Sequence, residues 1–238
     1  MNANRRTKLP TTLIRRLMLW AFDRLYNEAA WAYDLAAVVA GGVYWYEWGR
    51  AVLPFVAAAP VVEVGTGRGR LLVALAAAGH RPIGVDLSPA MIRYTRRTVG
   101  SAGVDIPLVR ADGMALPLAD ATIGTLVTTF PAPYIAHVAT RREFARVLRP
   151  GGRWLWADAP RAVGLPSLRG GLTTLLGSRL ASDARPVAAF LLREPSDAFD
   201  VEVHRVVVGP TVIMVRAATR RERRDTEGQE SGGQAGGS

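Results

Sequence analysis

The sequence predicts an α/β fold in which a parallel β-sheet is covered by helices on both faces and closed by an antiparallel hairpin. Short apolar runs alternate with amphipathic segments between residues 60 and 158, and glycine, proline or aspartate bounds many of these runs. Two β-rich runs then flank Gly209-Pro210 near the end of the chain. With 238 residues, of which 49% are apolar, the chain is long enough to bury a substantial core.

The elements of the central part follow from apolar runs and from residues that typically begin or end a helix. Ser88 followed by Pro89 predicts a helix start, because the serine oxygen accepts from a free amide and proline suits the first helical position. Thr140 and Glu143 have the spacing of a capping box for a helix that ends near Leu148, before a turn at 150–152. The expected strands are 61–64, 82–86, 106–110, 123–129 and 154–157, a further helix is expected at 71–78, and the hairpin strands at 201–208 and 211–215.

Composition divides the chain into a helical cap at 1–57, an α/β core at 58–160, a lid insert and closing hairpin at 161–216, and a disordered tail at 217–238. In the cap, residues 13–26 have apolar side chains at helical spacing and a basic face, which fits either packing on the domain or contact with an anionic membrane surface through residues 11–26. Ten of the aromatic residues lie between Trp20 and Phe55, which fits either a core or a cover for a flat apolar substrate.

The charge and the cysteine count exclude several classes of function. The net charge is +10, but only Lys8 among the 30 cations is lysine, which indicates a compositional bias toward arginine more than selected contacts with nucleic acid. Without cysteine, the chain has no disulfides, thiolate metal sites or cysteine nucleophiles, and we expect no metal site. No segment has the pattern of a membrane span or a signal peptide, so we expect a soluble, cytoplasmic, bacterial-type protein.

The informative string is VVEVGTGRG at 61–69, an apolar strand that leads into a glycine-rich loop and a helix. Such a loop lets the backbone approach a ligand, and the helix start offers free amides, although Arg70 stands where a dinucleotide fingerprint has glycine. Glu63 precedes the loop and is placed to accept hydrogen bonds from a ligand ammonium or from the loop itself. Asp86, at the end of the second strand, is placed to accept from both hydroxyls of a ribose, and Asp112, after the third, from an adenine amino group.

Five segments carry a resemblance to a known family: VVEVGTGRG at 61–69, GVDLSPAMI at 84–92, RADGMALPLAD at 110–120, TTFP at 128–131 and FARVLRPGGRW at 144–154. In their order and spacing, they resemble class I S-adenosylmethionine-dependent methyltransferases of the small-molecule type. The resemblance implies a Rossmann-like sheet of seven strands, mostly parallel with the last strand antiparallel, and S-adenosylmethionine (SAM) bound across the carboxyl ends of the first three strands. One departure is Gly124, where the family usually has an aspartate.

The resemblance and the positions of these residues together predict the site. The residues expected to bind SAM are Glu63, Gly65, Thr66, Gly67, Gly69, Asp86, Leu87, Asp112, Gly113, Met114, Thr129 and Phe130. The activated methyl group needs an acceptor aligned for in-line displacement and water kept out, with a general base only where the acceptor must lose a proton. The side chains expected to face the transferred group are Tyr134, His137 and Asp158, each of which could equally be structural.

The acceptor remains open between several classes. A small apolar or aromatic molecule is favoured by the aromatic cap, and a lipid-like or quinone acceptor would give the basic N-terminal helix a role at the membrane. A non-catalytic SAM-binding module is the alternative from a different class. Nucleic acid, RNA included, is disfavoured because cysteine is absent and FPAPY at 130–134 departs from the Asn-Pro-Pro-Tyr pattern of amino methylation. The oligomeric state is not predicted.

Overall fold

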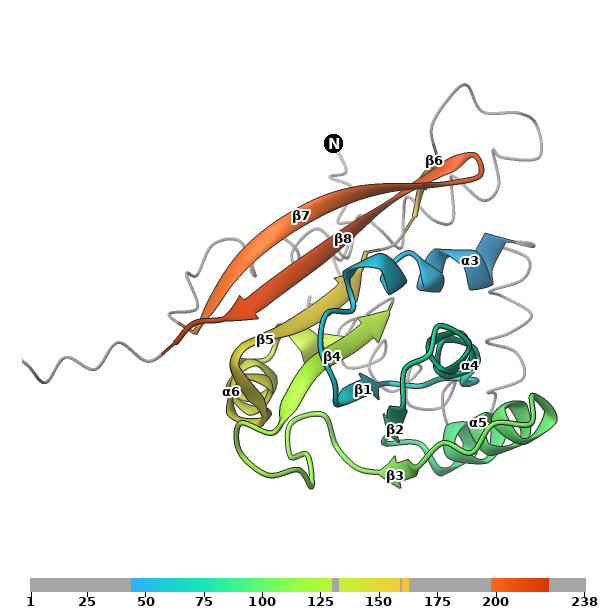
Figure 1. Ribbon diagram of the computed structural model, residues 1–238, viewed down its shortest axis with the longest axis horizontal. Coiled ribbons are helices and arrows are strands. Elements are labelled where there is room, and N and C mark those ends of the chain that lie inside the picture. Colours follow the sequence, from blue (N-terminus) through green and yellow to red (C-terminus); the bar gives the residue numbers. More distant parts are fainter. Residues whose placement is uncertain (1–43, 130–132, 159, 163–197, 223–238) are drawn as a thin grey trace, which may run out of the picture.

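The computed structural model describes residues 44–129, 133–158, 160–162 and 198–222. Its centre is one β-sheet with the strand order β3-β2-β1-β4-β5-β8-β6, and β7 also pairs with β8 (Figure 1). The strands are β1 (Val61–Val64), β2 (Pro82–Asp86), β3 (Leu108–Arg110), β4 (Ile123–Thr129), β5 (Leu148–Ala157), β6 (Arg161–Ala162), β7 (Phe199–Val208) and β8 (Thr211–Arg220). The helices are α3 (Trp45–Arg50), α4 (Arg70–Ala77), α5 (Pro89–Ser101) and α6 (Val138–Val147), with 3-10 turns η2 (Leu53–Phe55) and η3 (Pro133–Ala136).

The predicted seven-stranded, mostly parallel sheet is confirmed. β1 to β5 pair in parallel, whereas β8 runs antiparallel to β5 and forms a hairpin with β7. β6, which is only two residues long, adds a short eighth strand along β8. Figure 1 shows α6 on one side of the sheet and α3, α4 and α5 on the other, so parallel strands are covered on both faces as expected.

Several predicted boundaries differ from the structure. The predicted capping box is wrong: α6 begins after His137, the Thr140 hydroxyl donates to the carbonyl of Tyr134 at 2.7 Å, and Glu143 accepts from the amide of Leu116 at 2.6 Å. These partners come from segments outside the helix, and helix-capping patterns contain no information about them. β3 is shorter than predicted and begins at Leu108, whereas β5 begins at Leu148 and includes the expected turn at 150–152.

Gly124 has a local packing reason. A Cβ atom at this position would lie 2.6 Å from the carbonyl oxygens of both Ala58 and Ala59. The segment that leads into β1 therefore passes directly over β4, and a side chain at this position would separate the two. An aspartate could not occupy this place without moving the backbone.

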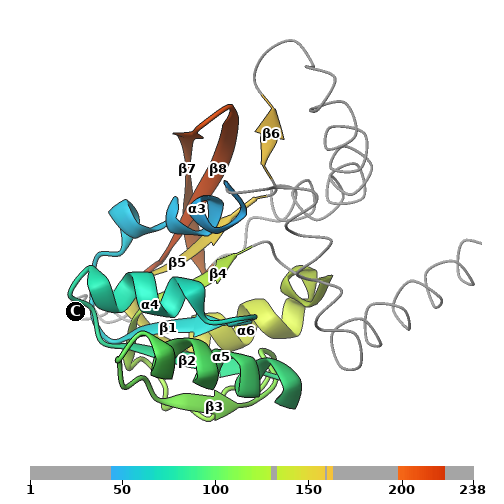
Figure 2. The ribbon, with the colours of Figure 1, turned by 90° about the vertical axis from the view of Figure 1, so that its right-hand side faces the viewer.

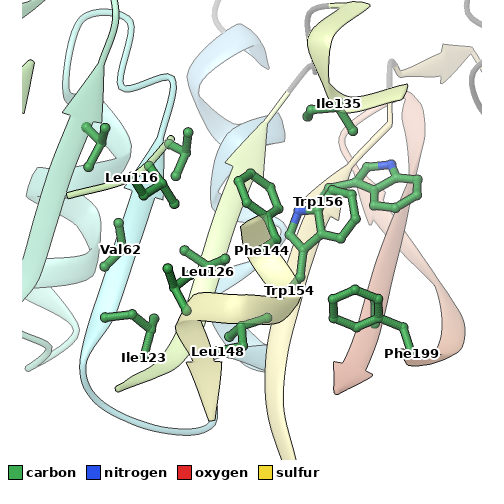
Figure 3. Packing of buried hydrophobic residues seen from close by; sticks show 14 residues of the cluster. Val62, Leu116, Ile123, Leu126, Ile135, Phe144, Leu148, Trp154, Trp156 and Phe199 are labelled. Carbon is green, nitrogen blue, oxygen red and sulfur yellow. The ribbon is translucent and has the colours of Figure 1, made fainter. Parts of the chain in front are cut away.

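Two apolar clusters hold the helices to the two faces of the sheet. On the α6 face, Phe144 and Trp154 pack edge to face with ring centroids 5.0 Å apart, and Trp156 and Phe199 extend the same cluster (Figure 3). On the opposite face, Leu75 of α4 and Val52 are fully buried against residues of β4, β5 and β8. Figure 2 shows α4 and α5 next to each other beside β1 and β2. This packing fixes the carboxyl ends of β1 and β2, where the glycine-rich loop begins.

Some predictions lie wholly or partly outside the described residues. These are the basic helix at 13–26 with its proposed membrane contact at 11–26, most of the cap at 1–57, the insert at 163–197, Phe130, and residues 223–238 of the expected tail. β8 continues through Arg220, so residues 217–220 belong to the sheet and not to a tail. Within the described ranges, the helices are too short or too polar to span a bilayer.

Candidate functional site

The glycine-rich loop between β1 and α4 is tightly turned and is fixed to α5. Gly65, Gly67 and Gly69 have φ angles of 82°, 51° and 76°, a region that glycine adopts without steric cost. Thr95 of α5 donates a hydrogen bond to the carbonyl of Gly67 at 3.0 Å, and its hydroxyl lies 3.1 Å from that of Thr66. The loop is therefore held in place by a side chain that the sequence did not single out. The sequence feature that could have indicated Thr95 is a polar residue on the buried face of α5, alongside Met91 and Val99.

Asp86 at the end of β2 joins this loop to the start of α5. One carboxylate oxygen accepts from the amide of Gly67 at 3.1 Å and the other from the amide of Ser88 at 2.8 Å. Burial raises the pKa of Asp86, and the hydrogen bonds from Ser88 and Gly67 oppose that rise. The structure records no ion pair between Asp86 and a cation of the described residues. Asp86 is thus placed by backbone amides at the position that the sequence predicted.

Glu63 lies inside β1, next to Asp86, and is only 2% exposed. Its Oε2 atom has no hydrogen-bond partner among the described residues. Burial, and secondly the negative charge of Asp86, raises the pKa of Glu63 well above its ordinary value. A buried carboxyl with an unused oxygen is costly for the protein alone, so this arrangement favours a cationic ligand that would supply the missing partner.

The third loop, after β3, brings Asp112, Gly113 and Met114 to the same edge of the sheet. Asp112 accepts a hydrogen bond from the amide of Met114 at 2.9 Å, which closes a tight turn. Met114 and Leu87 are among the large apolar side chains that remain exposed, at 37% and 59%. Exposed apolar side chains beside three carboxyl groups suit a flat ring with polar edges.

Tyr134, in η3 after β4, lies between the first and the third loop. Its hydroxyl donates to the carbonyl of Val64 at 3.4 Å. Burial raises the pKa of Tyr134, and the nearby charges of Asp86, Glu63 and Asp112 raise it further. The phenol therefore stays protonated at neutral pH, which makes Tyr134 a hydrogen-bond donor and a poor general base.

The other two predicted catalytic side chains have different surroundings. Asp158 accepts from the indole of Trp156 at 2.6 Å and from the Arg216 guanidinium at 3.1 Å, so both of its oxygens are used. His137 is exposed at the start of α6, where its backbone carbonyl accepts from Arg141. Thr129 is the last residue of β4 and lies half-buried at the carboxyl edge. The structure thus brings the three acids of the first three strands close to the glycine loop and to Tyr134. Asp158 is instead paired with Arg216.

The sequence of this region is similar to that of known proteins. Residues 61–152 match the family of methyltransferase domains. A demethylmenaquinone methyltransferase of Corynebacterium kroppenstedtii is 31% identical over 134 residues, which cover 55% of this chain and 56% of that protein. The ubiquinone/menaquinone biosynthesis C-methyltransferase UbiE of Syntrophotalea carbinolica is 33% identical over 149 residues, which cover 60% and 54%. The chain therefore spans about half the length of these relatives.

The fold also matches solved structures. Geranyl diphosphate C-methyltransferase from Streptomyces coelicolor, in complex with Mg2+, geranyl diphosphate and S-adenosyl-L-homocysteine, superposes with a TM-score of 0.52 at 15% identity. The superposition covers 73% of this chain and 78% of that one. At this identity the likeness shows a shared fold, which agrees with the strand order and the helix layers described above.

Proposed function

We propose that the protein transfers the methyl group of SAM to a small, apolar, quinone-type acceptor, because residues 61–152 match the methyltransferase domain family. The observation that carries the proposal is Glu63, a buried carboxyl with an unused oxygen, next to Asp86 and the glycine loop. SAM has an ammonium group, a ribose diol and an adenine ring, and this edge of the sheet offers a partner for each. The site therefore fits this cofactor by its donors and acceptors.

Each part of the site has a distinct proposed role. Asp86 accepts hydrogen bonds from the ribose hydroxyls, as acids at the end of the second strand do in nucleotide-binding α/β folds. Glu63 accepts from the ammonium group and completes its own hydrogen bonding. Asp112 accepts from the adenine amino group, while Leu87 and Met114 cover the faces of the ring.

The chemistry requires positioning more than proton transfer. When bound, SAM supplies a methyl group that is already activated on a sulfonium sulfur. The protein's contribution is to hold that group in line with the acceptor and to exclude water. Tyr134, as a protonated phenol, does not supply a base, and Asp158 is occupied by Arg216. Because neither Tyr134 nor Asp158 serves as a base, the site suits an acceptor that loses its proton easily, such as the hydroxylated ring of a reduced quinone.

The quinone-type acceptor is proposed from the relatives. One relative is named a demethylmenaquinone methyltransferase and another a ubiquinone/menaquinone biosynthesis C-methyltransferase, and the solved structure is named for geranyl diphosphate. A non-catalytic SAM-binding module is the alternative. Contact with a membrane through residues 11–26 and a cytoplasmic location stay proposals, as does the expectation that RNA is not a substrate.

Two measurements test the proposal. Calorimetric titration of the full chain with SAM and with S-adenosylhomocysteine (SAH) should give binding, and Asp86→Ala should weaken it about 100-fold or more, because two charge-assisted hydrogen bonds to the diol are lost. Asp105→Ala removes an exposed acid in the loop before β3 and should leave affinity unchanged. Absence of SAM binding in the wild-type chain would refute the proposed function.

The acceptor is tested separately with labelled SAM and a short-chain demethylated naphthoquinol. Transfer of label to a ring carbon is the expected result. Binding of SAM without transfer to this acceptor or to any labelled product from cell extract would favour the non-catalytic alternative.

A further inference from the structure

The ring of Tyr134 fills the space between two loops that we propose to hold SAM. A Cβ atom on Gly65, in the loop after β1, would lie 3.2 Å from the Tyr134 hydroxyl oxygen. A Cβ atom on Gly113, in the loop after β3, would lie 3.0 Å from Cε2 of the same ring. Both loops therefore contact Tyr134 directly, at positions where no side chain larger than hydrogen fits without movement.

The contact with the Tyr134 ring explains why glycine stands at position 113, whereas the backbone conformation there does not. Gly65 has a φ angle of 82°, which favours glycine in any surroundings, whereas Gly113 is not among the residues with positive φ. At Gly113 the obstacles to a methyl group are the Tyr134 ring and, at 3.3 Å, a methyl carbon of Val64. The sequence assigned Gly113 to the cofactor, but its immediate neighbour in the structure is the tyrosine.

The ring of Tyr134 is anchored from the side of the core. Ile135, the next residue, is completely buried in the cluster on the α6 face (Figure 3). Tyr134 itself packs against that cluster. The carbonyl of Tyr134 accepts from the Thr140 hydroxyl at 2.7 Å and from the amide of His137 at 2.9 Å. The ring is thus attached to a rigid part of the fold, and its hydroxyl oxygen and its Cε2 edge reach Gly65 and Gly113 in the two loops.

We propose that Tyr134 is a positioning residue whose ring sets the distance between the β1–α4 loop and the loop after β3, and so preorganises the nucleoside site. The inference rests on the proposed function, because it assumes that SAM lies across these two loops. The ring acts through its bulk. The hydroxyl oxygen adds the contact with Gly65, whereas its hydrogen bond to the carbonyl of Val64 is long, at 3.4 Å, and contributes little.

Three variants separate positioning from catalysis and from plain stability, with SAH as the probe in calorimetric titrations. Tyr134→Ala removes the ring, leaves both loops to be ordered by the ligand, and should weaken SAH binding about tenfold. Tyr134→Phe keeps the ring and should bind within about twofold of wild type. Leu148→Ala, in the same apolar cluster but at the amino end of β5, is the matched control: it should lower the melting temperature at least as much as Tyr134→Ala, yet leave SAH affinity unchanged in the folded protein.

A double-mutant cycle with Gly113→Ala tests the contact itself. Alone, Gly113→Ala should weaken SAH binding, because its methyl group pushes against the ring. In the Tyr134→Ala background the same change should cost nothing or restore part of the affinity, since the space is now open. Equal effects in both backgrounds would overturn the inference.

Other outcomes are equally decisive. Tighter SAH binding by Tyr134→Ala would mean that the ring occupies the nucleoside's own place, and a large loss with Tyr134→Phe would assign the effect to the hydroxyl; either contradicts the proposal. If wild type binds SAH and Tyr134→Ala binds it equally well, this inference fails while the proposed function stands. If wild type does not bind SAH, the proposed function itself fails.

Discussion

Asp86 and Asp158 occupy equivalent places in the fold, at the carboxyl end of a parallel strand, but their surroundings differ. Asp158 forms an ion pair with Arg216, whose side chain is 9% exposed, and also accepts from Trp156. Asp86 accepts from uncharged donors, among them the backbone amides of Gly67 and Ser88, and lies next to the buried Glu63, whose pKa is raised. A carboxyl group whose charge is already neutralised by a cation has its partner within the fold, whereas carboxyl groups that burial makes costly are suited to a cationic or hydroxylated ligand.

The largest expected effect comes from breaking the Asp158 pair. Arg216→Met leaves the Asp158 charge mostly buried without its cation, and should lower the free energy of unfolding by about 3–5 kcal/mol. SAH affinity at a temperature where the variant is folded should stay within about twofold, because this pair does not belong to the nucleoside site. Denaturant unfolding and calorimetry measure the two quantities. A tenfold loss of affinity without loss of stability would reverse our assignment of Asp158.

The next effect concerns Glu63 and its pH dependence. Glu63→Gln keeps the shape of the side chain but removes the charge, and should weaken SAH binding about tenfold through the lost charge-assisted hydrogen bond to the ammonium group. In the wild type, SAH binding should tighten as pH rises and should release protons, because the ammonium group binds the ionised carboxylate. In Glu63→Gln this dependence should shrink.

The stability of the unliganded protein should change in the opposite sense. The folded pKa of Glu63 is raised above the ordinary value of 4.5, so above that pH the unfolded chain binds fewer protons than the folded one. The free energy of unfolding therefore falls as pH rises from about 4.5 through the folded pKa, and it should fall less steeply in Glu63→Gln. Parallel pH slopes for the two proteins would show that Glu63 is not the buried acid that titrates.

The sequence alone predicts most strand bounds and helix starts, which depend on neighbouring residues. It predicts few of the side-chain contacts between segments that are distant in the chain. The bounds of β1, β2 and β4 and the Ser88 cap follow from apolar runs and turn residues close in sequence. Asp86 could be placed because a strand end fixes its direction. Asp158 could not be interpreted, since Arg216 follows 58 positions later and meets it only because β8 folds back along β5. The contact of Tyr134 with Gly65 and Gly113 similarly depends on how three loops converge.

The smallest expected effect tests whether α5 helps to orient the Gly67 amide that donates to the Asp86 carboxylate. Thr95 is fully buried and donates to the carbonyl of Gly67, whose amide in turn donates to Asp86. Thr95→Val keeps a similar shape but removes the donor, and should cost about 1 kcal/mol in the free energy of unfolding. SAH binding should weaken about threefold, because the Gly67 amide loses its fixed direction.

Thr98→Val on the same helix is the matched control for this change. The Thr98 hydroxyl donates to the carbonyl of Tyr94 within α5, at 3.1 Å, and does not reach the loop. SAH affinity should therefore be unchanged in Thr98→Val. If both variants bound SAH like the wild type, the loop would keep its shape without Thr95, and the amides that hold Asp86 would be fixed by the glycine turn alone. A weaker affinity in Thr95→Val only would extend the contrast with Asp158: one carboxylate is held by a cation on a neighbouring strand, the other by a chain of uncharged hydrogen bonds that leaves its charge available to a ligand.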